Sequence, residues 1–90
     1  LGRFGWKAGQ PTLNQQNAEA FANDMGLTST LVAQDNCSEL QLDCHTAPNG
    51  GEFEVSDSIL ASVLFYTRNL GVPARRDADT PHVLTGKNLF

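Results

Sequence analysis

Residues 56–71, SDSILASVLFYTRNLG, are the most strongly patterned stretch of the 90-residue chain and decide its fold class. Apolar side chains recur there at helical spacing, and they form a wide face: Ile59, Leu60, Val63, Leu64, Phe65, Tyr66 and Leu70. Ser56 is suited to cap the start of this helix, and Gly71 can adopt the left-handed conformation that ends it. A face of this width predicts burial on more than one side, with Tyr66 in the core.

A second helix is predicted over residues 12–25. Thr12 is a suitable N-cap, and Gly26 is a suitable terminator. The apolar stripe expected to pack against the rest of the protein consists of Leu13, Ala20, Phe21 and Met25.

The remaining segments predict less regular structure. Residues 81–90 start a third helix, with Pro81 in its first position, and residues 71–80 have the mixed charge and lack of apolar period typical of a linker. Residues 27–54 show no sustained period. The sequence therefore predicts an all-α fold of about three helices with long irregular connections.

The two cysteines, Cys37 and Cys44, are separated by more than the C-x-x-C spacing of most metal sites. A disulfide-closed loop is the favoured interpretation, which the chain-entropy model values at roughly 2–3 kcal/mol. A disulfide would indicate an oxidising compartment. Two free thiols, or a metal site that uses Cys44 and His45, are the alternatives.

The net charge of −4 is unevenly distributed, because no Lys or Arg occurs between Lys7 and Arg68. That stretch carries eight acids: Glu19, Asp24, Asp35, Glu39, Asp43, Glu52, Glu54 and Asp57. A phosphate backbone requires clustered cations, so nucleic-acid binding is excluded. The longest apolar run is far shorter than the ~20 residues that cross a bilayer. The acidic face either attracts a basic partner or keeps the protein soluble.

Three motifs carry a family resemblance: RFGWKA at residues 3–8, DMGLTS at residues 24–29 and FYTRNLGVPARR at residues 65–76. With them the chain resembles, over nearly its whole length, the bacterial di-haem oxidoreductases, which are also described as peroxidases and thiol oxidoreductases. The resemblance implies a cytochrome-c-like fold. It also implies that the chain is a fragment of a longer protein and lies between the two haem-attachment motifs of that protein. Residues 1–70 would end a first cytochrome-c-like domain, and residues 81–90 would begin a second.

The function implied by the resemblance is haem-dependent electron transfer, with peroxide reduction, in the bacterial periplasm. Haem c would belong to the parent protein, but the chain has no C-x-x-C-H motif. No haem would therefore be attached covalently to this fragment, which is expected to be inactive alone. The implied partners are the remaining cytochrome domains of the parent chain and an electron-donor protein. The wide face of the helix at 56–70 would be covered by residues 81–90 folding back or by a second molecule in a dimer.

A more distant resemblance, to di-haem cytochrome c peroxidases, implies roles for single residues. Gln16 and Asp24 match a catalytic Gln and Glu of those enzymes. Asp24 would transfer protons as a general acid–base, and Gln16 would hold water or peroxide by hydrogen bonds. Met25 would be a metal ligand, binding the haem iron through its thioether. Trp6 and Lys7 would line a haem edge, and Arg3 would pair with a haem propionate.

Each assignment has a structural alternative. Met25 can simply close the apolar stripe, Gln16 can lie on the surface, and Asp24 and Arg3 can be solvated. Phe4 and Trp6 are expected to cover apolar surface, with Trp6 as an anchor for the N-terminal arm. The alternative function is a small, disulfide-stapled, non-enzymatic interaction module that uses its acidic face. A thiol–disulfide enzyme is disfavoured by the cysteine spacing.

Overall fold

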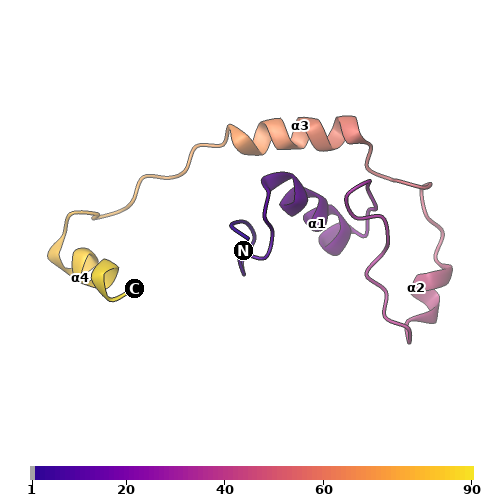
Figure 1. The fold of residues 1–90 in the computed structure, drawn as a ribbon, viewed down its shortest axis with the longest axis horizontal. Helices are drawn as coiled ribbons and strands as arrows, with labels where there is room; N and C mark the ends of the chain where they lie inside the picture. Colours follow the sequence, from indigo (N-terminus) through magenta and orange to yellow (C-terminus); the bar gives the residue numbers. More distant parts are fainter. Residues whose placement is uncertain (1) are drawn as a thin grey trace.

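The computed structural model describes residues 2–90, and this part of the chain is helical without a β-strand. The helices are α1 (Leu13–Met25), α2 (Leu42–Thr46), α3 (Asp57–Arg68) and α4 (Pro81–Leu89). Figure 1 shows α1 beside α3, with α2 at one end of the molecule and α4 at the other. The all-α prediction is confirmed, and α2 is an addition within the segment expected to be irregular. Within residues 2–90, no helix has the length and hydropathy that crossing a membrane requires.

The ends of α1 are set by the residues expected from the sequence. The Thr12 side chain accepts a hydrogen bond from the backbone N–H of Gln15 at 3.1 Å, which satisfies a free donor of the first turn. Gly26 ends the helix with φ = 67°, a left-handed conformation that glycine adopts without a Cβ penalty. Its N–H donates to the carbonyl of Ala22 at 3.0 Å.

α3 starts as predicted and ends earlier than predicted. Ser56 caps its first turn by accepting a hydrogen bond from the N–H of Ile59 at 3.4 Å. The prediction that Gly71 terminates the helix is wrong, since the last helical residue is Arg68 and Asn69 is the C-cap. The Asn69 side chain donates to the carbonyl of Phe65 at 2.7 Å, and this bond satisfies a free acceptor of the last turn.

The core lies between α1, α3 and the loops that flank them. Its buried apolar residues are Ala18, Val55 and Leu60, and Phe21, Leu27 and Val32 pack against this cluster. On α1 the buried positions are Asn17, Ala18 and Ala22. The predicted stripe was therefore right for Phe21, which packs against the core, but it missed the buried Ala18 and Ala22, and Met25 is 58% exposed.

A polar contact also joins the two packed helices. The Asn17 side chain of α1 donates to the hydroxyl of Thr67 on α3 at 3.1 Å. The hydroxyl of Thr67 in turn donates a hydrogen bond to the backbone carbonyl of Val63 in α3. Because Asn17 is buried, this bond also fixes how α1 and α3 are aligned along their axes.

Most of the wide apolar face of α3 is not covered within the described residues. Leu60 is buried, but Ile59, Tyr66 and Leu70 are exposed, and 73% of Phe65 is exposed. The core position predicted for Tyr66 is thus wrong. The expected fold-back of residues 81–90 does not occur either, because α4 does not contact α3. The segment between them runs outward, and the molecule measures 56 × 32 × 21 Å (Figure 1).

Glu54 holds together two loops that are far apart in the sequence. Its carboxylate accepts hydrogen bonds from the N–H of Gly50 at 2.7 Å and from the N–H and hydroxyl of Thr28 at 3.1 and 3.3 Å. These donors, the Gly50 N–H first, lower the pKa of the Glu54 carboxyl below its ordinary 4.5 because they favour the charged form. The N–H of Val55 also donates to the carbonyl of Thr28 at 2.9 Å, so the core residue Val55 is held beside the end of α1.

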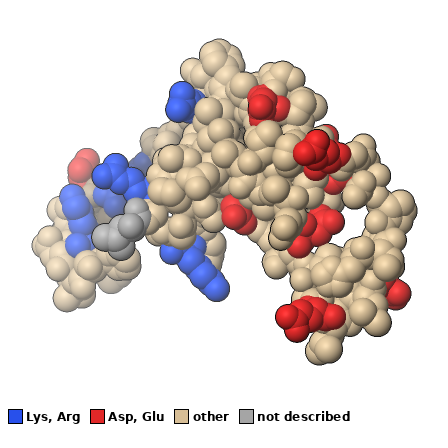
Figure 2. Space-filling view, turned by 45° about the vertical axis from the view of Figure 1, so that its right-hand side comes forward, with Lys and Arg blue, Asp and Glu red and all other residues tan. Residues whose placement is uncertain are grey.

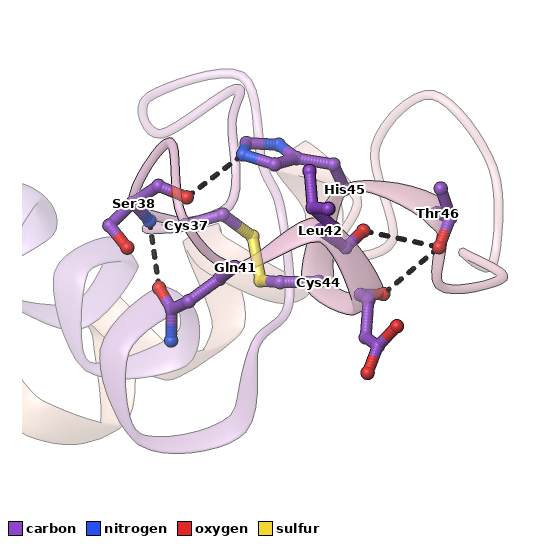
Figure 3. The surroundings of a disulfide bond; sticks show 8 residues. Cys37, Ser38, Gln41, Leu42, Cys44, His45 and Thr46 are labelled. Atoms are coloured by element: carbon purple, nitrogen blue, oxygen red, sulfur yellow. Dashed lines mark hydrogen bonds between the residues drawn. A yellow bond between two sulfur atoms is a disulfide. The ribbon is translucent and has the colours of Figure 1, made fainter.

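The predicted disulfide is confirmed between Cys37 and Cys44, whose Cα atoms are 5.9 Å apart. Figure 3 shows that it ties α2 to the segment before it, and we call residues 37–46 the disulfide loop. The ring of His45 lies 3.0 Å from the carbonyl of Ser38, so it has a structural partner. The alternatives of free thiols and of a metal site at Cys44 and His45 are not found in the described residues.

Candidate functional site

The N-terminal loop, residues 3–10, is closed by backbone hydrogen bonds and lies next to α1 (Figure 1). Phe4 and Gln10 exchange two such bonds, at 3.0 and 3.1 Å, and the N–H of Ala8 donates to the carbonyl of Gly5 at 3.1 Å. Gly5 and Ala8 have positive φ angles of 82° and 49°, which turn the chain sharply. Trp6 and Lys7 are therefore at the tip of the loop.

A hollow of about 650 Å³ separates this loop from α1, and we call it the loop-side hollow. Its lining includes four residues that the sequence had singled out: Trp6, Lys7, Gln16 and Asp24. The lining is completed by Gly5, Gly9, Gln10, Glu19, Ala20 and Asn23. The geometry thus brings together residues that are up to 18 positions apart in the sequence, from Trp6 to Asp24.

A smaller hollow of about 260 Å³ lies between α1 and α3, and we call it the helix-side hollow. It is mostly apolar, and it is lined by Asn17, Ala20, Phe21, Asp24, Met25 and Val63. Ala20 and Asp24 line both hollows, so the two adjoin along α1. The candidate site is made of these two adjoining hollows: Gln16 lines the loop-side hollow, Met25 lines the helix-side hollow, and Asp24 lines both.

The polar groups of this site are accessible. Asp24 is exposed, although it lies in the last turn of α1, where the helix dipole disfavours an anion. Gln16 is half-buried, and among residues 2–90 its carboxamide has no hydrogen-bond partner. The thioether of Met25 is also accessible. These groups can therefore contact a ligand without first breaking a contact within the protein.

Two residues of the N-terminal segment behave differently from expectation. Trp6 is fully exposed, at 100%, so the prediction that it covers apolar surface is wrong. The turn at Gly5 leaves Trp6 at the exposed tip of the loop, whereas Phe4 is half-buried. Arg3 is exposed and lines neither hollow. The structure therefore does not bring Arg3 together with the other candidates.

Sequence reasoning missed three residues of the site. Ala20 and Phe21 were assigned to the core stripe of the helix; Phe21 does pack against the core, but both residues also line the helix-side hollow. Val63 reaches the same hollow from α3. Their helical spacing was visible in the sequence, but only the crossing of α1 and α3 shows which side of each helix stays open.

The charged side chains are segregated over the surface. Figure 2 shows Lys and Arg mainly toward one end of the molecule and Asp and Glu mainly toward the other. This follows from the absence of cations between Lys7 and Arg68. Lys7 is therefore the cation closest in sequence to the candidate site on α1, and it lines the same hollow as Asp24.

Comparison with known protein families assigns the chain to one of them. The family described as di-haem oxidoreductase, putative peroxidase, matches residues 1–90, which is the whole chain. The chain belongs to this family, and the resemblance noted from its motifs is confirmed. No curated protein and no solved structure shows significant similarity to it.

The residues of the helix-side hollow fit one side of a haem. A porphyrin is a flat apolar ring, and Phe21, Val63 and Ala20 supply apolar contacts next to the accessible thioether of Met25. Thioether sulfur is an established axial ligand of haem iron. Covalent attachment does not fit this chain, because it has no C-x-x-C-H motif. The donor set therefore suits contact with a haem rather than its attachment.

Proposed function

We propose that the chain is part of a haem-dependent oxidoreductase of the bacterial periplasm that reduces peroxide, and that the hollows along α1 form one wall of its reaction site. The observation that carries the proposal is that Asp24 lines both hollows, sharing the loop-side hollow with Gln16 and the helix-side hollow with Met25. The family supplies the general chemistry, which is that of a di-haem oxidoreductase. The disulfide supports an oxidising compartment.

The haem c of the parent protein would be attached by residues outside this chain and would supply the electrons for the reaction. Met25 would approach the iron through its sulfur, and Phe21 and Val63 would exclude water from that side. Reduction of hydrogen peroxide to water consumes protons as well as electrons. Asp24 would deliver a proton to the leaving oxygen as a general acid.

Gln16 and Lys7 would bind and orient the substrate in the loop-side hollow. The carboxamide of Gln16 can donate a hydrogen bond to one peroxide oxygen and accept one from its O–H group. The ammonium of Lys7 would favour developing negative charge on oxygen. Trp6, at the tip of the loop, would lie along the edge of the haem.

The proposal includes a domain assignment. Residues 1–70 would complete a first cytochrome-c-like domain, residues 71–80 would be a linker, and residues 81–90 would begin the next domain. The exposed apolar face of α3 supports this assignment, because an apolar surface of this kind commonly marks a contact with another domain. In the parent protein the remaining cytochrome domains would cover it.

The test uses the full-length parent protein. Its absorbance should show covalently bound haem, and it should consume hydrogen peroxide with a reduced electron donor. Asp24→Asn should lower kcat about 10²–10⁴-fold without changing the haem content, because the carboxamide cannot supply the proton. Asp43→Asn, the same chemical change on the disulfide loop, should leave kcat unchanged. A parent protein without haem, or an Asp24→Asn variant of full activity, would refute the proposal.

A second candidate is a non-enzymatic interaction module. It is favoured by the exposure of Leu40 and Leu42 on the disulfide loop, next to the acids Glu39 and Asp43. Such a surface would suit a partner with basic residues around an apolar patch. Haem absorbance in the parent protein decides between the two candidates, since the module requires none.

A further inference from the structure

A side chain on residue 5 and the carboxamide of Gln16 would compete for the same space. Gly5 lies in the turn of the N-terminal loop, with φ = 82°. A Cβ atom added to Gly5 would lie 2.5 Å from Oε1 of Gln16, which is closer than real Cβ atoms come to oxygen. The missing side chain of Gly5 is therefore what allows the Gln16 carboxamide to rest against the loop.

This contact determines where the Gln16 side chain can be. Its Oε1 lies where a side chain on Gly5 would be, and Gly5 and Gln16 both line the loop-side hollow. The side-chain hydrogen bonds at the start of α1 belong to Thr12 and Gln15, and within residues 2–90 none is formed by the carboxamide of Gln16. The space left by Gly5, rather than a polar partner, is therefore the feature that accommodates the carboxamide in this position.

We infer that Gly5 is a positioning residue for substrate binding: its lack of a side chain allows the Gln16 carboxamide to lie in the loop-side hollow, where it can form hydrogen bonds with a small ligand such as hydrogen peroxide. The inference rests on the proposed function for the identity of the ligand. It adds to that function a reason for the glycine in the RFGWKA segment, which the helix pattern does not explain.

Backbone strain and side-chain displacement can be separated, because the chain offers a matched control. Gly26 has a similar positive φ of 67°, but nothing lies within 4 Å of a Cβ atom built there. Gly5→Ala and Gly26→Ala therefore both add a side chain at positive φ, and only Gly5→Ala moves Gln16. The loop itself tolerates a Cβ atom at positive φ, as Ala8 shows with φ = 49°.

The experiment compares Gly5→Ala, Gly26→Ala, Gln16→Ala and the double variant Gly5→Ala/Gln16→Ala in the full-length holoprotein. Crystal structures should show the Gln16 carboxamide displaced in Gly5→Ala and unmoved in Gly26→Ala. The kcat/KM for hydrogen peroxide should fall about 10–100-fold in Gly5→Ala, since misplacement of a binding group by about 1 Å has effects of this size. In the Gln16→Ala background, Gly5→Ala should cause no further loss.

Two results would overturn the inference. One is a Gly5→Ala structure in which the Gln16 carboxamide has not moved. The other is an equal loss of kcat/KM from Gly5→Ala in both backgrounds, because a purely structural role does not depend on Gln16. If the parent protein does not reduce peroxide at all, the proposed function fails, and the crystal structures alone still decide whether Gly5 positions Gln16.

Discussion

Replacement of Leu60 by alanine tests whether the small α1–α3 core holds the candidate site in place. Leu60 is the largest side chain of the buried cluster, with 3% of its surface exposed, and it packs with Ala18 and Val55. Every residue of the helix-side hollow belongs to α1 or α3. Loosening of this core should therefore destabilise the fold and open the hollow.

The expected magnitude follows from the burial of Leu60. Leu→Ala removes three carbon atoms, which at about 0.8 kcal/mol for each buried CH₂ amounts to roughly 2.4 kcal/mol of transfer free energy. Measured costs for such changes span about 2–5 kcal/mol, depending on the cavity that remains. Because the cluster is small and lies near open hollows, its neighbours can relax, and we expect about 2–3 kcal/mol.

The measurement is thermal unfolding of the 90-residue chain, followed by the circular dichroism of its helices. A loss of 2–3 kcal/mol corresponds to a fall in Tm of roughly 10–20 °C for a chain of this size. Leu40→Ala is the matched control, because Leu40 is 92% exposed and its loss should change stability by less than about 0.5 kcal/mol. Equal Tm values for Leu60→Ala and Leu40→Ala would refute the assignment of the core.

Two further predictions concern the loops and the exposed face of α3. The donors around Glu54 lower its pKa, so its contribution to stability is complete above the unfolded pKa near 4.5 and is lost as pH falls through the lower, folded pKa. The free energy of unfolding, measured by urea titration, should therefore decline less below pH 4.5 in Glu54→Gln than in the wild type. Replacement of the exposed Glu52 by Gln is the control and should not weaken the decline. The same dependence of the unfolding free energy on pH in the wild type and Glu54→Gln would contradict this. The 90-residue chain taken alone should dimerise through α3, so Phe65→Asp should yield a monomer in sedimentation experiments and Leu40→Asp should not. A wild-type chain that is monomeric at high concentration would disprove the dimer.

Both ends of α1 and the start of α3 were predictable because they depend on local chemistry. Thr12 and Gly26 set α1, and Ser56 starts α3, since a capping side chain or a glycine acts on groups within a few residues of itself. The end of α3 was missed because Asn69 satisfies the last turn before Gly71 is reached. Asparagine near a helix end was a signal available in the sequence.

The packing was less predictable, because it depends on which faces meet. Ala18 and Ala22 are the buried apolar residues of α1, with Phe21 packed against the same core, and helical spacing alone did not select the two alanines. The contact between Glu54 and Thr28 joins residues 26 positions apart, and no local sequence pattern predicts it. The width of the apolar face on α3 was read correctly, yet it did not reveal that the face stays exposed in this chain.

Only part of the candidate site could be predicted from the sequence. The resemblance selected Arg3, Trp6, Lys7, Gln16, Asp24 and Met25, and all of these except Arg3 line at least one of the two hollows. The hollows themselves arise from the turn of the N-terminal loop and from the crossing of two helices. Both depend on long-range contacts that spacing in the sequence does not encode.

The most direct test of the central claim is the position of iron in the full-length parent protein. An anomalous-difference map at the iron absorption edge locates each haem iron without assumptions about the surrounding chain. Our account predicts an iron peak next to the helix-side hollow, on the side of α1 that carries Asp24 and Met25. If each iron lies on another side of this domain, away from both hollows, the account is contradicted.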